Sequence, residues 1–181
     1  MHSPATLRVL LALVTPRLLL TFLASAVLLS APAEARESLY EPSRAQRLTS
    51  AEQAHFGPRS GRFTYDARMI RAARIAQQRA HSQTTWRCWR YVKNALLAAR
   101  VIATRPRTAW AKQAGDELCR RFGFSRLNLR DPWQAPIGAV IVYGGADAGH
   151  VEMRTASGFV SDFVSLQPYP RPLLGIYVKR S

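Results

Sequence analysis

Apolar residues recur with a helical period in the middle of the chain and alternate with polar residues toward its end. The helical period predicts three helices, over residues 67–80, from Cys88 to Ala99 and from Ala109 to Arg121. The alternation predicts four strands, over residues 136–143, 150–154, 159–164 and 173–179. Helices first and hairpin-connected strands second predict an α+β fold, in which N-terminal helices pack on a C-terminal antiparallel sheet.

The first residues carry the pattern of an export signal. An apolar run from Leu18 to Leu29 precedes small residues at Ala33 and Ala35. The run is shorter than the roughly 18 residues of a membrane-spanning helix, although the apolar stretch from Val9 to Val14 leaves a retained anchor as the alternative. We expect a signal peptide over 1–35 that is cleaved near Ala35, a polar, flexible leader over 36–65 and a folded domain over 66–181.

This division changes how the charge is interpreted. The chain has 26 Lys and Arg against 11 Asp and Glu, a formal charge of +15. Cleavage after Ala35 would remove two arginines and one glutamate and so lower the charge only to +14. We therefore expect a periplasmic or secreted domain near an anionic envelope surface, with no specific nucleic acid as partner and no transmembrane segment after cleavage. A basic antibacterial or DNA-binding protein is the alternative that charge alone supports.

Cys88 is the first candidate for chemistry. It lies in the first turn of a predicted helix, where free backbone N–H groups and the helix dipole favour an anion. Arg87 and Arg90 flank it and also favour a thiolate. The backbone N–H of Cys88 could donate to a developing oxyanion. The alternative is an inert cysteine on an apolar stripe.

His150 begins a predicted strand, and two carboxylates are candidates to orient it. Asp162 lies across the predicted hairpin, and an odd number of connecting residues would place it opposite His150, whereas an even number would offset the two by one. Glu152, on the same strand face as His150, is the alternative acid. A thiolate, an imidazole and a carboxylate together predict nucleophilic acyl transfer.

The second cysteine, two further histidines and the tryptophans have simpler interpretations. Cys119 is predicted to be a buried apolar residue, with a disulfide to Cys88 as the alternative. His55 and His81 have no partner at metal-ligand spacing, so we expect no metal site and no cofactor. A glycan groove could be lined by Trp86, Trp89, Trp110 and Trp133, although such residues more often belong to a core.

Three segments resemble the CHAP and NlpC-type superfamily of cysteine peptidases and amidases. They are Cys88-Trp-Arg-Tyr-Val-Lys, Pro136-Ile-Gly-Ala-Val-Ile-Val-Tyr and Gly149-His-Val-Glu-Met, within a similarity that runs from about Asp66 to Ser181. The resemblance implies a papain-like fold and cleavage of peptide or amide bonds in bacterial peptidoglycan. It implies Cys88 as nucleophile, His150 as general base and Asp162 as the third polar residue, and it matches Tyr91 to the aromatic residue after the nucleophile.

The sequence also departs from this family. Trp86 and Arg87 stand where many members have Gly or Gln, so the second oxyanion donor is unidentified, and the short loop from Gly144 to Gly149 transfers no substrate preference. The resulting hypothesis is an exported peptidoglycan endopeptidase or amidase with a Cys88–His150–Asp162 triad and with Tyr91, Trp86 and Trp89 near the oxyanion or substrate. The alternative is a catalytically inactive wall-binding module of the same fold. The sequence predicts neither the scissile bond nor the oligomeric state.

Overall fold

The computed structural model describes residues 50–181. The predicted signal peptide and residues 36–49 of the predicted leader lie outside the described residues. Among residues 50–181, no helix combines the length and the apolar character that crossing a membrane requires.

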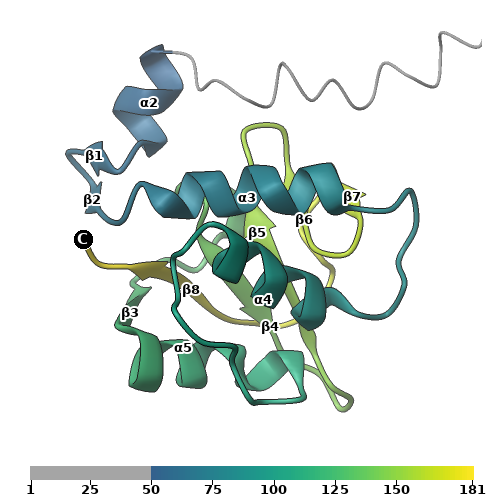
Figure 1. Cartoon of the computed structure of the whole chain (residues 1–181). Coiled ribbons are helices and arrows are strands. Elements are labelled where there is room, and N and C mark those ends of the chain that lie inside the picture. The colour runs from purple at the N-terminus through teal and green to yellow at the C-terminus, as the bar shows by residue number, and fades with distance from the viewer. Residues whose placement is uncertain (1–49) are drawn as a thin grey trace, which may run out of the picture. The chain divides into compact units, whose positions relative to one another are not determined.

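Two of the predicted helices form close to their expected positions. Helix α3 spans Arg68–Arg79 and helix α4 spans Cys88–Ala98, and the two pack against each other (Figure 1). Their buried apolar residues fall three or four positions apart or next to one another: Met69, Ala72, Ala73 and Ala76 in α3, and Trp89, Val92, Ala95 and Leu96 in α4. Each helix therefore buries one stripe, and the alanines of α3 allow close packing between the helices.

The sheet has six strands in the order β3-β8-β4-β5-β6-β7, and every neighbouring pair is antiparallel. The strands are β3 (Phe124–Leu127), β4 (Val140–Tyr143), β5 (His150–Arg154), β6 (Phe159–Val160), β7 (Val164–Ser165) and β8 (Leu173–Lys179). All residues of the interior strand β4 are buried, so both of its faces are covered.

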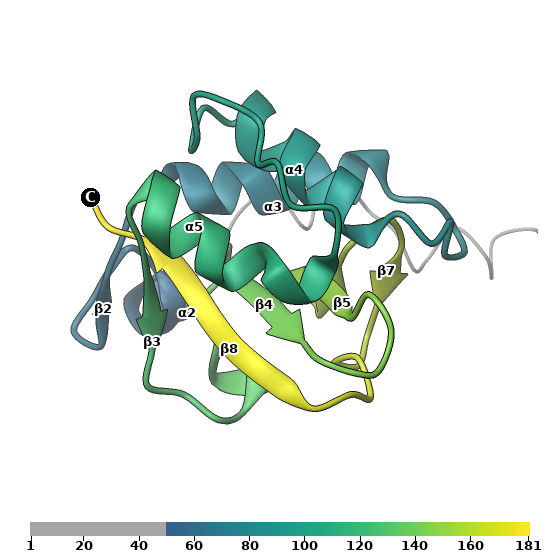
Figure 2. The ribbon, with the colours of Figure 1, turned by 90° about the horizontal axis from the view of Figure 1, so that it is seen from below.

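The helices gather on one side of this sheet. Figure 2 shows α3, α4 and α5, which spans Ala114–Phe122, on the same side of strands β4 and β8. Helix α4 packs on β5, and α5 packs on β3 and β8. The α+β class and the packing of N-terminal helices on a C-terminal antiparallel sheet are thus confirmed.

The segment expected to be a flexible leader has regular structure where it is described. Residues 50–65 contain α2 (Ser50–Phe56) and the short strands β1 (Arg59–Ser60) and β2 (Phe63–Thr64). The Tyr65 hydroxyl is buried and donates to the carbonyl of Phe56 at 2.6 Å or of Ile137 at 2.9 Å, and burial raises its pKa. The expectation of an extended leader is therefore wrong for this part, because Tyr65 ties it to the domain.

Two other predicted elements differ in detail, and two observed elements were not predicted. The third helix is preceded by a short 3₁₀ turn, η1 (Ala111–Gln113), and it ends with Gly123 in the left-handed conformation, as predicted. The predicted strand over 159–164 is split into β6 and β7, because the Ser161 N–H bonds the Phe163 carbonyl and turns the chain. Strand β3 and the 3₁₀ turn η2 (Pro132–Gln134) were not predicted.

A buried carboxylate holds the connection between α4 and α5. Glu117 accepts the backbone N–H groups of Arg107 at 2.6 Å and Thr108 at 2.9 Å, and it pairs with Arg121 at 2.6 Å. Burial would raise the pKa of Glu117, but these donors outweigh it and lower the pKa to about 2. The connection is thereby fixed against α5.

Gly138 allows the start of α3 to approach the sheet. It has a φ of +91°, and a Cβ atom there would lie 2.5 Å from the carbonyl carbon of Met69. Gly138→Ala should therefore lower the free energy of unfolding by about 2–4 kcal/mol, measured by urea denaturation. Gly61→Ala is the control, because a Cβ there meets nothing within 4 Å, and it should change stability by less than about 0.5 kcal/mol. Equal effects of the two variants would contradict this account.

Candidate active site

Helix α4 and strand β5 bring the predicted nucleophile and base into one pocket. Cys88 is the first residue of α4 and is partly buried, and His150 is the first residue of β5 and is buried. A pocket of about 420 Å³ is lined by both side chains. The two residues are 62 positions apart in sequence and meet because α4 packs on β5.

Glu152, not Asp162, is the carboxylate beside His150. Its Oε2 lies 3.6 Å from Nε2 of His150, and its Oε1 accepts the Tyr143 hydroxyl at 2.6 Å. The backbone N–H of Tyr169 also donates to Oε1, at 3.3 Å. Glu152 is 2% exposed, so the carboxylate is held in place by protein groups. Among residues 50–181, Nε2 of His150 has no hydrogen-bond partner, so its contact with Glu152 is an ion-pair contact.

An aromatic ring fixes the plane of the imidazole. The ring of Tyr169 stacks on His150 with a centroid separation of 3.8 Å and an interplanar angle of 17°. Tyr143 contacts both rings more obliquely, at 6.1 Å from His150 and 6.3 Å from Tyr169. Burial and the neighbouring Glu152 raise the pKa of Tyr143, so its hydroxyl remains a donor to the carboxylate.

The surroundings of His150 favour the imidazolium. Burial alone would lower its pKa, but interactions with Cys88 and Glu152 outweigh burial and raise the pKa to about 9. A protonated imidazole is thus placed next to the Cys88 sulfur and the Glu152 carboxylate. The carboxylate stabilises the cation from the same strand.

The hairpin register explains why Asp162 does not reach His150. Strands β5 and β6 pair Met153 with Val160 and Arg154 with Phe159. The connection, Thr155–Gly158, therefore has an even number of residues, the case that offsets Asp162 from His150. Contrary to the predicted triad, Asp162 does not lie opposite His150, and the alternative acid, Glu152, lies beside His150 on the same strand.

Asp162 instead holds the segment that leads into Cys88. Its Oδ2 accepts the backbone N–H groups of Thr85 at 2.5 Å and Arg87 at 3.3 Å. The hydroxyls of Thr84 and Thr85 donate to the same oxygen, at 3.2 and 2.9 Å. Burial would raise the pKa of Asp162, but these donors outweigh it and lower the pKa. The carboxylate thus fixes the backbone immediately before the nucleophile.

The aromatic residues predicted near the site lie in three different environments. Trp86 is 83% exposed at the wall of the Cys88 pocket, with a left-handed φ of +61°. Trp89 is buried, and its indole N–H donates to the Thr108 hydroxyl at 3.1 Å or to the Thr108 carbonyl at 3.2 Å. Tyr91 lines a separate recess, where its hydroxyl bonds Nε2 of His81. Of these three residues, Trp86 alone has an exposed ring at the pocket wall, whereas Trp89 lines the pocket but is buried in the core.

The second cysteine and the possible metal ligands lie outside this arrangement. Cys119 is free and partly buried, and burial raises its pKa. Within residues 50–181, no group of three His, Cys, Asp or Glu side chains could hold a metal ion.

Four residues of the site were not identified from the sequence: Tyr143, Tyr169, Asp147 and Arg171. The last two form an ion pair at the pocket wall. Tyr143 had a usable signal, because it ends one predicted strand, His150 begins the next, and the two pair directly. Tyr169 and Arg171 lie in the irregular connection before β8, where no periodicity predicts direction.

Comparison with known proteins supports the fold. No family model matches the chain, and no curated protein matches it in sequence. The structure is similar to a chain in the crystal structure of the type VI native effector–immunity complex Tae3–Tai3 from Ralstonia pickettii. The sequences are 27% identical, the TM-score is 0.52, and the match covers 62% of this chain and 98% of that chain. This similarity agrees with the α+β class, whereas membership of the CHAP and NlpC-type superfamily stays a prediction.

The pKa of His150 tests the assignment of the carboxylate. Nuclear magnetic resonance titration of the ring should give a pKa of about 9. Glu152→Gln and Cys88→Ala should each lower this pKa, because each variant removes one of the two interactions that stabilise the imidazolium against the effect of burial. Asp162→Asn should leave the pKa unchanged, since Asp162 bonds residues 84–87. A lower pKa in Asp162→Asn, with none in Glu152→Gln, would contradict the assignment.

The stability of the Asp162 variant tests its structural role. Asp162→Ala removes a buried acceptor and leaves the part-buried N–H groups of Thr85 and Arg87 without a partner, so the free energy of unfolding should fall by about 3 kcal/mol in urea denaturation. Asp147→Ala is the control, because that carboxylate also accepts a backbone N–H, from Gly149, but is 59% exposed. The free energy of unfolding should fall clearly less in Asp147→Ala than in Asp162→Ala. A similar fall in the two variants would refute the role of burial.

Proposed function

We propose that the chain is an exported cysteine hydrolase that cleaves an amide or peptide bond of bacterial peptidoglycan, acting in the periplasm or after secretion. The observation that carries this proposal is the thiol at the start of α4 beside an imidazole whose pKa is raised by that thiol and by Glu152. The sequence resemblance to peptidoglycan peptidases and amidases supports the substrate. The structural similarity to a chain of a type VI effector–immunity complex supports an effector-type role.

In this proposal the triad is Cys88, His150 and Glu152. The Cys88 thiolate attacks the carbonyl carbon, and the backbone N–H of Cys88 donates to the oxyanion that forms. The imidazolium of His150 gives its proton to the leaving amine as the carbon–nitrogen bond breaks, which leaves a thioester. Neutral His150 then removes a proton from water, whose oxygen attacks the thioester and releases the carboxylic acid and the thiolate.

The buried carboxylate serves both halves of this cycle. Glu152 stabilises the imidazolium before attack and keeps the ring oriented when it is neutral. Tyr143 and the Tyr169 backbone hold Glu152, and the Tyr169 ring stacks on the base. Asp162 acts as a positioning residue, because it fixes Thr85 and Arg87 immediately before the nucleophile.

The two cysteines provide a matched test. Incubation of the protein with purified peptidoglycan, followed by mass analysis of the released fragments, should identify the cleaved bond. Cys88→Ala should lower the rate by at least about 10³-fold, because no other group forms the thioester. Cys119→Ala should retain activity, since Cys119 lies on α5 outside the pocket.

Undiminished hydrolysis by Cys88→Ala would overturn the mechanism. Binding to peptidoglycan without any hydrolysis by the unaltered protein would instead support the inactive wall-binding module.

A further inference from the structure

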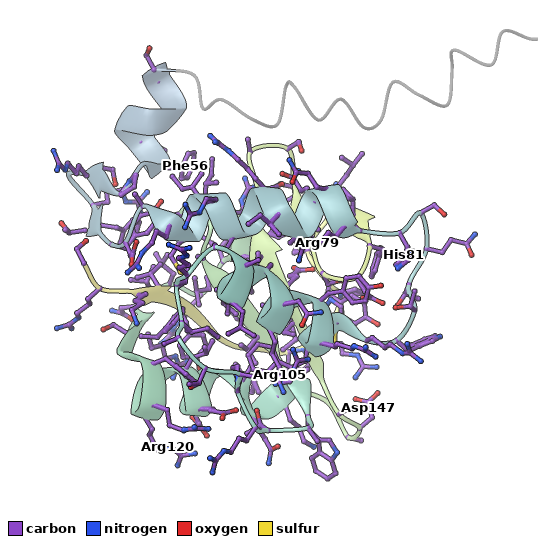
Figure 3. All side chains as sticks on the ribbon, viewed as in Figure 1. Phe56, Arg79, His81, Arg105, Arg120 and Asp147 are labelled. Carbon is purple, nitrogen blue, oxygen red and sulfur yellow. The ribbon has the colours of Figure 1, made fainter. Side chains whose placement is uncertain are left out.

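A second recess lies next to the Cys88 pocket, between the end of α3 and the outer side of α4. It has a volume of about 410 Å³. Its polar lining consists of Arg79, His81, Arg87, Arg90, Tyr91 and Asn94, and we call it the arginine recess. Figure 3 shows Arg79 and His81 at the end of α3 and in the loop that follows, on the side of the molecule where α4 begins.

The arginine recess is positively charged and has no carboxylate in its lining. Arg79, Arg87 and Arg90 contribute three guanidinium groups, and all three residues are exposed. None of the three forms an ion pair with a residue in the described range 50–181. Three unpaired guanidinium groups around one concave site favour an anionic ligand, because each offers paired donors to a carboxylate or phosphate.

The position of two of these arginines is unfavourable for the helix itself. Arg87 is the N-cap residue of α4 and Arg90 lies in its first turn, which contains no acidic residue. The helix dipole places partial positive charge at this end, so cations here cost stability. A bound anion would interact favourably with both the arginines and the helix end. The two arginines therefore do not stabilise α4, and at this helix end they can face both the Cys88 sulfur and an anion in the recess.

The walls of the recess are held by hydrogen bonds. The hydroxyl of Tyr91 bonds Nε2 of His81, and the Asn94 side-chain oxygen accepts Nη1 of Arg105 at 2.5 Å. The backbone N–H of His81 donates to the Asp162 carbonyl at 2.8 Å, which fixes the loop after α3 to the sheet. The His81, Tyr91 and Asn94 walls of the recess are thus held in place by contacts within the protein.

Two residues connect this recess to the nucleophile. Arg87 and Arg90 line both the arginine recess and the Cys88 pocket. Resting on the proposed function, we infer that the recess is a subsite that binds a carboxylate of the substrate's peptide, away from the scissile bond. A concave site that shares its wall with the nucleophile fits one extended substrate better than a flat membrane surface. Peptide stems carry free carboxylates, and guanidinium groups recognise them by paired hydrogen bonds.

Binding to the whole chain with Cys88→Ala tests this inference without turnover. Calorimetry would compare a disaccharide–tetrapeptide wall fragment in its free-acid form with the same fragment in which all carboxylates are amidated. The free acid should bind about tenfold more tightly. Arg79→Gln should remove most of this difference and leave the affinity for the amidated fragment unchanged. Arg79 suits the test because it is exposed and lines only the arginine recess.

Arg120→Gln is the matched control and should keep the tenfold preference. Arg120 is an exposed arginine on α5, well away from Arg79 and His81 (Figure 3). Equal binding of the two fragments, or an equal loss for both in Arg79→Gln, would overturn the subsite while leaving the proposed hydrolysis intact. Arg79-dependent binding to phosphatidylglycerol vesicles, with no preference between fragments, would overturn it in favour of a membrane site. Failure of both fragments to bind would count against the proposed substrate as well.

Discussion

The Asp162 carboxylate accepts hydrogen bonds from residues 84–87, and the backbone carbonyl of the same residue accepts the N–H of His81. Asp162 lies between β6 and β7, whereas its donors lie between α3 and α4. One buried residue therefore joins the helical part of the domain to the sheet. Since the donors end at the residue before Cys88, this attachment also sets where α4 begins and where the thiol lies relative to β5.

Two buried carboxylates have different roles in the site. Asp162 collects backbone donors and has a lowered pKa, so it stays anionic and fixes position. Glu152 is held by Tyr143 and the Tyr169 backbone, and it raises the pKa of His150. Both carboxylates are buried, so each depends on its partners, because an anion excluded from water is stable only when its partners are in place. The protonation of the imidazole is consequently set by Cys88 and Glu152, and its orientation by Glu152 and the Tyr169 ring.

Much of the fold could be predicted from local patterns. The apolar stripe from Cys88 to Ala99 gave α4 with little error, and the strand over 173–179 is β8. The error over the orienting acid has a definite cause: one residue more or less in the turn after Arg154 decides which strand face Asp162 joins, and composition does not fix that number. The role of Tyr65 in ordering residues 50–65, and the stacking of Tyr169, depend on contacts between distant segments. Such contacts do not produce a periodic pattern of apolar residues in the sequence.

The thiol and its base belong to different halves of the chain, and neither half contains a complete site. Cys88 is the first residue of α4, whereas His150 and Glu152 lie on β5 and Asp162 lies between β6 and β7. A chain that emerges from synthesis or crosses a membrane in extended form therefore has a cysteine but no base to activate it. In the proposed hydrolase, activity would appear only when the last strands have folded against α4, and the cell that makes the chain would be spared until then.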